Sequence, residues 1–590
     1  MDIKGALTPL TAWKQLFKKP HTITVPFVKR EAAPRYRGFH TNDLEKCVGC
    51  GTCATICQNE AIDMVPVEGI EPKKGDSGLR PMIDYGRCCW CALCVDVCPT
   101  GSLQMSREYI WIRDNPEDFR FIPGKDHPEF LENPGYQSDP RYSFIDLERV
   151  PMKELDPVER VEVKPWAEVI LGYTEEEARK EAERCLGCGL CVSACPATMH
   201  IPDYIAAIAK GDYEEAVNIF YDTNPLPEMC GKVCTRQCEF VCTVGYKGEP
   251  VAIRWLKRFA SEQFDDLRDV VKTEKEPPKG KKVAVIGAGP SGLTVGYYLS
   301  LKGYEVTIFE AFPKAGGMTM AGIPKYRFPI DSLEKQIKLI ESVGVKIIYN
   351  HRVTAEEFEK LRKEYDALFI GVGLMDAWNL DVPGDDHPQV ISALKMLIDV
   401  NLGKKVEIGE KVVVVGGGNV AMDAARVSRR LGAEVIVSYR RRLVDMPADE
   451  EEIEEAKAEG VIFETQTIPA RIEPLENRKI RYVYWKAKMV DQGPGKRPKP
   501  VPIKEEEYYH DVDRVIVAIG QKGEFSFLPP DVAEKIVERG KIKVDPETGM
   551  TPIEGVFAGG DAVNRVMDAI SAIGDGLRAV KGIDRYLSGR

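Results

Sequence analysis

Residues 281–310 read KKVAVIGAGPSGLTVGYYLSLKGYEVTIFE, and this stretch decides the fold of the C-terminal half of the chain. A Val/Ile-rich strand leads into a Gly-rich turn, a helix and a second strand that ends at Glu310. Gly287 permits the tight turn, Gly289 lets the backbone approach a pyrophosphate, and Gly292 allows close helix–strand packing. The stretch therefore predicts a dinucleotide site with the phosphates at the helix N-terminus and Glu310 on a ribose. Its turn consists of Gly287, Ala288, Gly289, Pro290, Ser291 and Gly292.

The same unit recurs at 411–442, KVVVVGGGNVAMDAARVSRRLGAEVIVSYRRR, and predicts a second dinucleotide site. Its second strand ends in Arg440 and Arg441 where an acid would favour NAD(H). Because arginines pair with a 2′-phosphate, the pattern favours NADP(H) over NAD(H). The alternative is that both arginines are solvated surface residues. The predicted turn consists of Gly416, Gly418, Asn419, Val420 and Ala421.

Short Val/Ile-rich strands alternate with helical patterns from 281 to the end, which indicates α/β architecture with parallel sheets. The segment EGVFAGGDAVN (554–564) resembles the second FAD motif of two-dinucleotide flavoproteins. That resemblance implies FAD in the first site, held also by Gly560 and Asp561, and it extends to Gly316, Gly317 and Arg327. The order of motifs over 150–590 resembles the glutamate synthase small subunit. It implies two Rossmann-like dinucleotide-binding domains. One binds FAD and comprises 281–384 and 513–590, and the other binds NAD(P) and comprises 385–512.

The 17 cysteines all lie within the first 242 residues, and eight of them form two C-x2-C-x2-C-x3-C runs. In such runs three thiolates bind one cubane and the fourth reaches the other cluster. Zinc, the alternative, favours separated C-x2-C pairs. Cys89 fits neither run and is expected to be a small packed thiol. The predicted [4Fe–4S] ligands are Cys47, Cys50, Cys53 with Cys98, and Cys88, Cys91, Cys94 with Cys57.

The first array resembles bacterial-type two-cluster ferredoxins, and predicts a 2[4Fe–4S] ferredoxin-like domain at 41–105. The preceding KKPHTITVPFVKREAAPRYRGFH (18–40) makes it more similar to the two-cluster subunit of respiratory complex I and related hydrogenases. This resemblance implies that the basic arm at 1–40 docks within an assembly; the alternative is that the arm covers the chain's own surface. Residues 106–165 show little periodicity and are expected to be a linker.

A second array lies in a segment, 166–270, whose apolar residues have helical spacing. This segment resembles the iron–sulfur domain shared by the glutamate synthase small subunit and dihydropyrimidine dehydrogenase. The resemblance implies one cluster on Cys185, Cys188, Cys191 and Cys242. It implies another on Cys195, Cys234 and Cys238, with a Glu or Gln ligand at a position that is Lys257 here. An ammonium group cannot ligate iron, so we expect Cys230 to be the fourth ligand, giving four clusters.

Bulk properties exclude several functions. The net charge of −11 argues against general binding to nucleic acid or anionic membrane. No apolar run approaches the roughly 20 residues that cross a bilayer, and the first residues lack a signal peptide's apolar core, so a cytoplasmic location is expected. The chain has no catalytic triad, phosphate-transfer motif or amidotransferase nucleophile, and no catalytic side chain is predicted. Its histidines are isolated and are expected to be structural or solvated.

No cysteine follows Cys242, which excludes the active-site disulfide of thioredoxin-reductase-like flavoproteins. We therefore expect FAD to exchange hydride with NAD(P)H and to pass single electrons to the clusters. The expected partner is ferredoxin or a catalytic subunit, such as a hydrogenase or formate dehydrogenase, in a hetero-oligomeric complex. The alternatives are a small subunit of glutamate synthase or sulfide dehydrogenase, and an electron-wiring scaffold with a non-catalytic nucleotide site.

Overall fold

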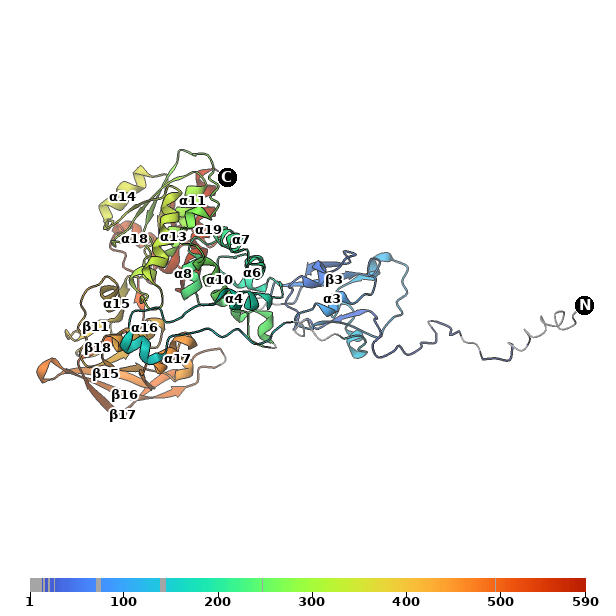
Figure 1. Cartoon of the computed structure of the whole chain (residues 1–590), viewed down its shortest axis with the longest axis horizontal. Helices are drawn as coiled ribbons and strands as arrows, with labels where there is room; N and C mark the ends of the chain where they lie inside the picture. Colours follow the sequence, from blue (N-terminus) through green and yellow to red (C-terminus); the bar gives the residue numbers. More distant parts are fainter. Residues whose placement is uncertain are drawn as a thin grey trace, which may run out of the picture. The chain divides into compact units, whose positions relative to one another are not determined.

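The computed structural model describes residues 13, 16–19, 22–25, 27–70, 76–137, 145–246, 248–493 and 495–589 (Figure 1). Much of the predicted arm at 1–40 therefore lies outside the described residues. The chain divides into two compact units. The first comprises Met1–Leu147 with Leu186–Leu190 and Tyr246–Glu249, and the second comprises the remainder.

The first unit contains two short helices, α2 (Thr52–Thr55) and α3 (Leu93–Asp96), each beginning inside a cysteine run. An antiparallel pair joins β1 (His40–Asn42) to β4 (Leu103–Met105). A three-stranded antiparallel sheet has the order β2 (Ile62–Pro66), β3 (Leu79–Asp84), β5 (Arg120–Phe121). Its core is aromatic, and Phe39 packs against the rings of Tyr85 and Phe130.

The predicted linker at 106–165 is wrong over its first half. Strand β5 pairs with β3, and the side chains of Phe121 and Phe130 are buried in the core of the first unit. The arm also ends earlier than predicted, because Phe39 is buried and His40 belongs to β1. Phe39, Phe121 and Phe130 are single buried residues in segments without a helical or strand-like pattern of apolar residues, so periodicity did not predict them. Residues 138–144 lie outside the described part.

The second unit begins with a helical domain within the predicted 166–270. Helix α4 begins at a capping box, in which Thr174 accepts from the backbone of Glu177 and Glu177 accepts from the backbone of Thr174. Pro227 occupies the first turn of α8, where its missing N–H costs nothing. The helices are α4 (Glu175–Glu183), α5 (Leu190–Ala194), α6 (Ile201–Lys210), α7 (Tyr213–Tyr221), α8 (Pro227–Val233), α9 (Gln237–Phe240) and α10 (Ile253–Glu262).

A five-stranded parallel sheet follows, with the order β22 (Val556–Ala558), β9 (Ala367–Ile370), β6 (Lys282–Ile286), β7 (Glu305–Phe309), β8 (Lys346–Ile348). The last four residues of both β6 and β7 are buried, as expected for parallel strands covered on both faces. Around the sheet lie α11 (Pro290–Leu301), α13 (Ile330–Ser342), α14 (Ala355–Glu364) and α19 (Ala569–Leu587).

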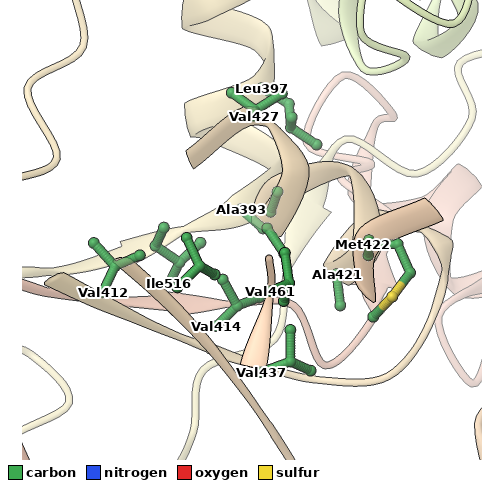
Figure 2. Packing of buried hydrophobic residues seen from close by; sticks show 14 of the residues in the cluster. Ala393, Leu397, Val412, Val414, Ala421, Met422, Val427, Val437, Val461 and Ile516 are labelled. Atoms are coloured by element: carbon green, nitrogen blue, oxygen red, sulfur yellow. The ribbon is translucent and has the colours of Figure 1, made fainter. Parts of the chain in front are cut away.

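A second parallel sheet has the order β11 (Val390–Ser392), β18 (Arg514–Val517), β12 (Lys411–Val415), β13 (Glu434–Tyr439), β14 (Ile462–Thr465). Its helices are α15 (Ala393–Asn401), α16 (Asn419–Arg430) and α17 (Glu450–Ala458). Figure 2 shows the core, in which Val412, Val414 and Val437 of the strands pack with Ala421 and Met422 of α16. An antiparallel sheet, β15 (Thr467–Pro474), β16 (Ile480–Val490) and β17 (Lys499–Val512), adjoins it.

The predicted domain boundary at 513 lies one strand too early in the chain. Strand β18 pairs in parallel with β12 and β11, so residues 514–517 belong to the second sheet and not to the first. The returning segment reaches the first sheet only at β22. A buried apolar strand fits either sheet, and its sequence does not say which. The predicted class of fold, a multidomain α/β chain with parallel sheets, is confirmed.

Candidate redox-cofactor sites

The first Gly-rich turn joins β6 to α11 and has the form that a pyrophosphate needs. Gly287 has a φ of +99°, which side-chain-bearing residues rarely adopt, and an added Cβ would lie 2.6 Å from the Gly371 carbonyl oxygen. At Gly289, the N-cap of α11, an added Cβ would meet no atom closer than 3.8 Å. Open space at a helix N-terminus is where a phosphate binds. Ala288, Ser291 and Gly292 are buried beneath this space, and Pro290 is the first residue of the helix.

Glu310, directly after β7, holds the shape of this turn. One carboxylate oxygen accepts from the Ala288 amide at 2.6 Å and the other from the Phe312 amide at 2.7 Å. Burial raises the pKa of Glu310, and these backbone hydrogen bonds oppose that shift. Each carboxylate oxygen has a second lone pair. The predicted ribose contact therefore stays a prediction that the geometry permits.

Two further predicted segments reach the same turn. The Gly316 amide donates to the Ala288 carbonyl at 2.8 Å, and an added Cβ at Gly317 would lie 2.9 Å from the Gly289 Cα. An added Cβ at Gly560 would lie 2.8 Å from Ser291 Oγ. The structure thus brings 287–292, 316–317 and 560–561 together.

Asp561 carries the clearest sign of a missing ligand. Its Oδ1 atom is buried and has no hydrogen-bond partner among the described residues. Burial raises the pKa of this carboxyl group to about 6. Buried polar atoms are normally hydrogen-bonded, so the orphaned oxygen indicates a group that donates to it when bound. The donor set and the open turn fit FAD.

Arg327, predicted from the flavoprotein resemblance, is paired with two carboxylates of the second dinucleotide domain. Its guanidinium binds both carboxylate oxygens of Asp423, at 2.7 and 2.9 Å, and one oxygen of Glu452 at 2.7 Å. Asp423 belongs to α16 and Glu452 to α17. The structure therefore uses Arg327 to tie the segment after α12 (Met318–Ala321) to the second dinucleotide domain.

The second Gly-rich turn repeats these features between β12 and α16. An added Cβ at Gly416 would lie 2.2 Å from the Ala518 carbonyl oxygen, whereas at Gly418 the nearest atom would be 4.0 Å away. Ala421 is fully buried at the helix–strand contact, as predicted for a small third residue. Asn419 Oδ1 accepts from the Asp449 amide at 2.8 Å, and Val420 is half-buried.

The three consecutive arginines after β13 differ in what they bind. Arg441 Nε donates to the Pro498 carbonyl at 2.9 Å, and Arg442 forms an ion pair with Asp445 at 2.8 Å. Arg440 is exposed and has neither an ion pair nor a hydrogen bond within the described residues. Its guanidinium is therefore available to a phosphate.

The first cysteine array forms two groups. A cavity is lined by Cys47, Cys50, Cys53 and Cys98, the predicted ligands of one cluster. Burial, together with the neighbouring thiols of Cys88, Cys91 and Cys57, raises the pKa of Cys94 to about 12. The structure thus brings each predicted set of four together. Cys89 is exposed, where a packed thiol was expected, so that expectation is wrong.

The second array gathers around a buried lysine. Burial lowers the pKa of Lys257, but the surrounding thiols of Cys230, Cys234, Cys238 and Cys195 outweigh it and raise the pKa. The hydroxyl of Tyr204 is fully buried, is close to Cys238 and Cys195, and has no hydrogen-bond partner in the described structure. An orphaned donor beside four thiols fits a cluster, whose sulfur atoms accept hydrogen bonds.

The other predicted set is divided, because Cys188 lies in Leu186–Leu190 of the first unit while Cys185, Cys191 and Cys242 lie in the second. Its assignment stays a prediction. Among the described side chains, no group of three or more His, Cys, Asp or Glu has the geometry for one metal ion. The ligands of a four-iron cluster lie farther apart than those of one ion, so this finding does not bear on clusters.

The segments that follow Cys195 and Cys234 contact the start of α19. An added Cβ at Gly574 would lie 2.5 Å from the Pro196 carbonyl oxygen. Thr235 Oγ1 donates to Asp568 Oδ2 at 2.6 Å, and Asp568 is the N-cap of α19. Since α19 follows the Gly560–Asp561 turn, the lysine-centred cysteine group lies against the element that leads out of the predicted flavin site.

Sequence reasoning missed His40. Its Nε2 lies 3.2 Å from Cys94 Sγ, and its side chain is buried in the core of the first unit. His40 precedes the first cysteine run at a spacing that matches no ligand motif, so the sequence carried no signal for it.

Known proteins agree with this architecture. A model described as pyridine nucleotide-disulphide oxidoreductase matches residues 281–576, about half of the chain. The chain belongs to this family. A model for the 4Fe–4S domain II of dihydropyrimidine dehydrogenase matches residues 162–268, and one for a 4Fe–4S dicluster domain matches 46–102. As a member of the family, the chain is an oxidoreductase. The other two matches show that it also contains iron–sulfur domains, and the predicted resemblances are confirmed.

Three relatives illustrate the range of the family. The NADP(+)-dependent formate dehydrogenase subunit beta of Moorella thermoacetica is 39% identical over 429 residues, covering 67% of this chain and 60% of that protein. The NADPH-Fe(3+) oxidoreductase subunit beta of Geobacter sulfurreducens is 37% identical, covering 67% and 63%. The glutamate synthase [NADPH] small chain of Halomonas elongata is 32% identical, covering 76% and 98%. The chain thus spans less than two thirds of the first two relatives.

No helix in the described ranges combines the length and the apolar character that crossing a bilayer demands.

Proposed function

We propose that the chain is a diaphorase-like subunit that exchanges hydride between NADP(H) and FAD and relays single electrons through four [4Fe–4S] clusters. The observation that carries this proposal is the contact of the lysine-centred cysteine group with α19. Thr235 and Pro196 each directly follow a cysteine of that group and touch the first turns of this helix. Electrons leaving the flavin site therefore have a short covalent and hydrogen-bonded route to the group.

The chain's own residues hold the cofactors and set their surroundings. FAD, when bound, converts a hydride into two single electrons. The turn at 287–292 offers backbone N–H groups and a helix N-terminus to its phosphates, while Asp561 offers an unpaired carboxylate oxygen. Glu310 keeps the turn in its open form through the Ala288 amide.

Electrostatics support the assignment of the cluster on Cys195, Cys230, Cys234 and Cys238. Four thiolates leave a [4Fe–4S] cluster with net negative charge, which is costly in a buried site unless it is paired. The Lys257 ammonium is buried among these thiols and supplies the opposite charge. A fully cysteine-ligated cluster and a lysine in place of the family's carboxylate or amide ligand are therefore consistent with each other.

The partner is proposed from the relatives. Two of them are named as subunits of a formate dehydrogenase and of an NADPH-Fe(3+) oxidoreductase, and a third as a chain of glutamate synthase. We therefore expect this chain to work in a hetero-oligomeric complex, with ferredoxin or a catalytic subunit such as a formate dehydrogenase or hydrogenase as its partner.

Dye reduction by the isolated chain tests the proposal. The anaerobically purified chain, with full FAD occupancy, is expected to reduce an artificial acceptor with NADPH. Gly418→Val fills the open space of the second turn and is expected to abolish this activity while FAD stays bound. Gly289→Val fills the first turn and is expected to prevent FAD binding. A wild-type chain with full FAD that reduces no dye with NADPH or NADH would instead be a scaffold.

A further inference from the structure

The imidazole of His40 is held in one orientation inside the core of the first unit. His40 lies on β1, and its side chain is buried together with Tyr85 and Cys94. The Tyr85 hydroxyl oxygen accepts from the His40 backbone amide at 2.8 Å and lies 3.0 Å from His40 Nδ1. The second ring nitrogen, Nε2, lies 3.2 Å from Cys94 Sγ.

This arrangement favours the tautomer with the ring proton on Nε2. The Tyr85 oxygen already accepts the His40 amide proton, so its own O–H is free to donate to Nδ1. An Nδ1 atom that accepts leaves the ring proton on Nε2. The Nε2–H group then points at Cys94 Sγ and donates to it.

Cys94 belongs to the set formed with Cys57, Cys88 and Cys91. Backbone amides contact two other sulfurs of this set: Ala61 donates to Cys57 at 3.3 Å and Trp90 donates to Cys88 at 3.4 Å. Such amide contacts belong to the loop itself, whereas His40 reaches Cys94 from a strand 54 residues away. A hydrogen bond to a ligand sulfur stabilises the more negative, reduced cluster and raises its reduction potential.

We propose that His40 is a positioning residue for electron transfer, which donates Nε2–H to the Cys94 thiolate and raises the reduction potential of the cluster bound by Cys57, Cys88, Cys91 and Cys94. Tyr85 has the supporting role of fixing the tautomer. The inference rests on the proposed function for the presence of that cluster, but not for the identity of the partner or the direction of electron flow.

Redox titration of the holoprotein, followed by electron paramagnetic resonance, tests the inference. In His40→Leu the ratio of reduced to oxidised cluster at a fixed potential is expected to fall about tenfold for one cluster of the first unit, equivalent to about 59 mV. Tyr85→Phe removes the hydroxyl that selects the tautomer and is expected to cause a smaller fall in the same cluster. His127→Leu is the matched control. His127 packs against Phe121 and Phe130 in the same core, and no hydrogen bond joins it to a cysteine within the described part of the chain, so no shift is expected.

A second measurement uses the unaltered protein and needs no variant to fold. With ¹⁵N-labelled histidine, the reduced cluster is expected to show a weak nitrogen hyperfine coupling, which is lost in His40→Leu. Unchanged titrations in His40→Leu with iron and sulfide content intact, or the absence of this coupling, would overturn the inference and leave the proposed function standing. A first unit that binds no cluster at all would overturn both.

Discussion

Arg440→Ala tests how the second dinucleotide site distinguishes NADPH from NADH. Arg440 directly follows β13, where the fold places the group that contacts the 2′ position of the ribose. Its guanidinium is exposed and has no partner among the described residues, so binding a phosphate breaks no existing contact. The substitution removes a charge-assisted hydrogen bond to a phosphate while leaving both Gly-rich turns intact.

The expected magnitude follows from this geometry. Hydrogen bonds to charged groups contribute about 1.5–3 kcal/mol, and exposure to water and salt places this one near the lower end. A loss of about 1.4 kcal/mol corresponds to a tenfold weaker interaction. We therefore expect the KM for NADPH to rise about tenfold, the KM for NADH to stay unchanged, and kcat with either nucleotide to stay within about twofold.

Steady-state dye reduction at low and high ionic strength measures these constants. The effect on NADPH should shrink as salt screens the phosphate. Arg442→Ala is the matched control, because Arg442 is also exposed but its charge is paired with Asp445. An unchanged KM for NADPH in Arg440→Ala, or an equal rise in Arg442→Ala, would refute the assignment of Arg440 to the 2′-phosphate.

Three further predictions concern the cofactor sites. Cys230→Ala should lose the iron and sulfide of one cluster, whereas Cys89→Ala, at an exposed thiol outside every ligand set, should lose none; equal metal content in both variants would contradict the assignment of Cys230. Lys257→Met removes a buried cation beside the same cluster, so redox titration should show its potential lowered by roughly 60 mV, the tenfold equivalent for one electron. In the flavin-free protein the pKa of Asp561 is raised from 3.8 to about 6 in the folded state, so its charge destabilises the fold increasingly as the pH rises through that window. Asp561→Asn should therefore raise the Tm of the flavin-free protein at pH 7 but not at pH 4, and an equal change at both pH values would exclude this cause.

The dinucleotide turns and the cysteine runs were predictable because their constraints are local. Gly287 needs a positive φ and close contact with Gly371, and no other residue type meets both conditions. The spacing of Cys47, Cys50 and Cys53 likewise places three thiols around one cavity without help from distant residues. In both cases the residues that form the motif lie close together in sequence, so the sequence pattern itself specifies the geometry.

The features that sequence reasoning missed depend on distant packing. Phe121 and Phe130 join the core of the first unit from a segment without periodicity, and β18 pairs with β12 across about 100 residues of chain. His40 reaches Cys94 only because β1 pairs with β4. Arg327 matches a flavoprotein motif, yet its partners Asp423 and Glu452 come from the other dinucleotide domain. Such contacts depend on the tertiary fold and are not marked by any residue spacing in the sequence.

Anaerobic stopped-flow mixing with NADPH tests directly whether electrons pass from NADPH through FAD to the clusters. We expect flavin absorbance to bleach first. The broad absorbance of the iron–sulfur clusters should then fall while flavin absorbance partly recovers, as electrons pass from the flavin to the cluster beside α19. Freeze-quenched samples should show the paramagnetic signal of a reduced [4Fe–4S] cluster in the same time range. Flavin that is fully reduced by NADPH, with clusters that stay oxidised although dithionite reduces them, would contradict it.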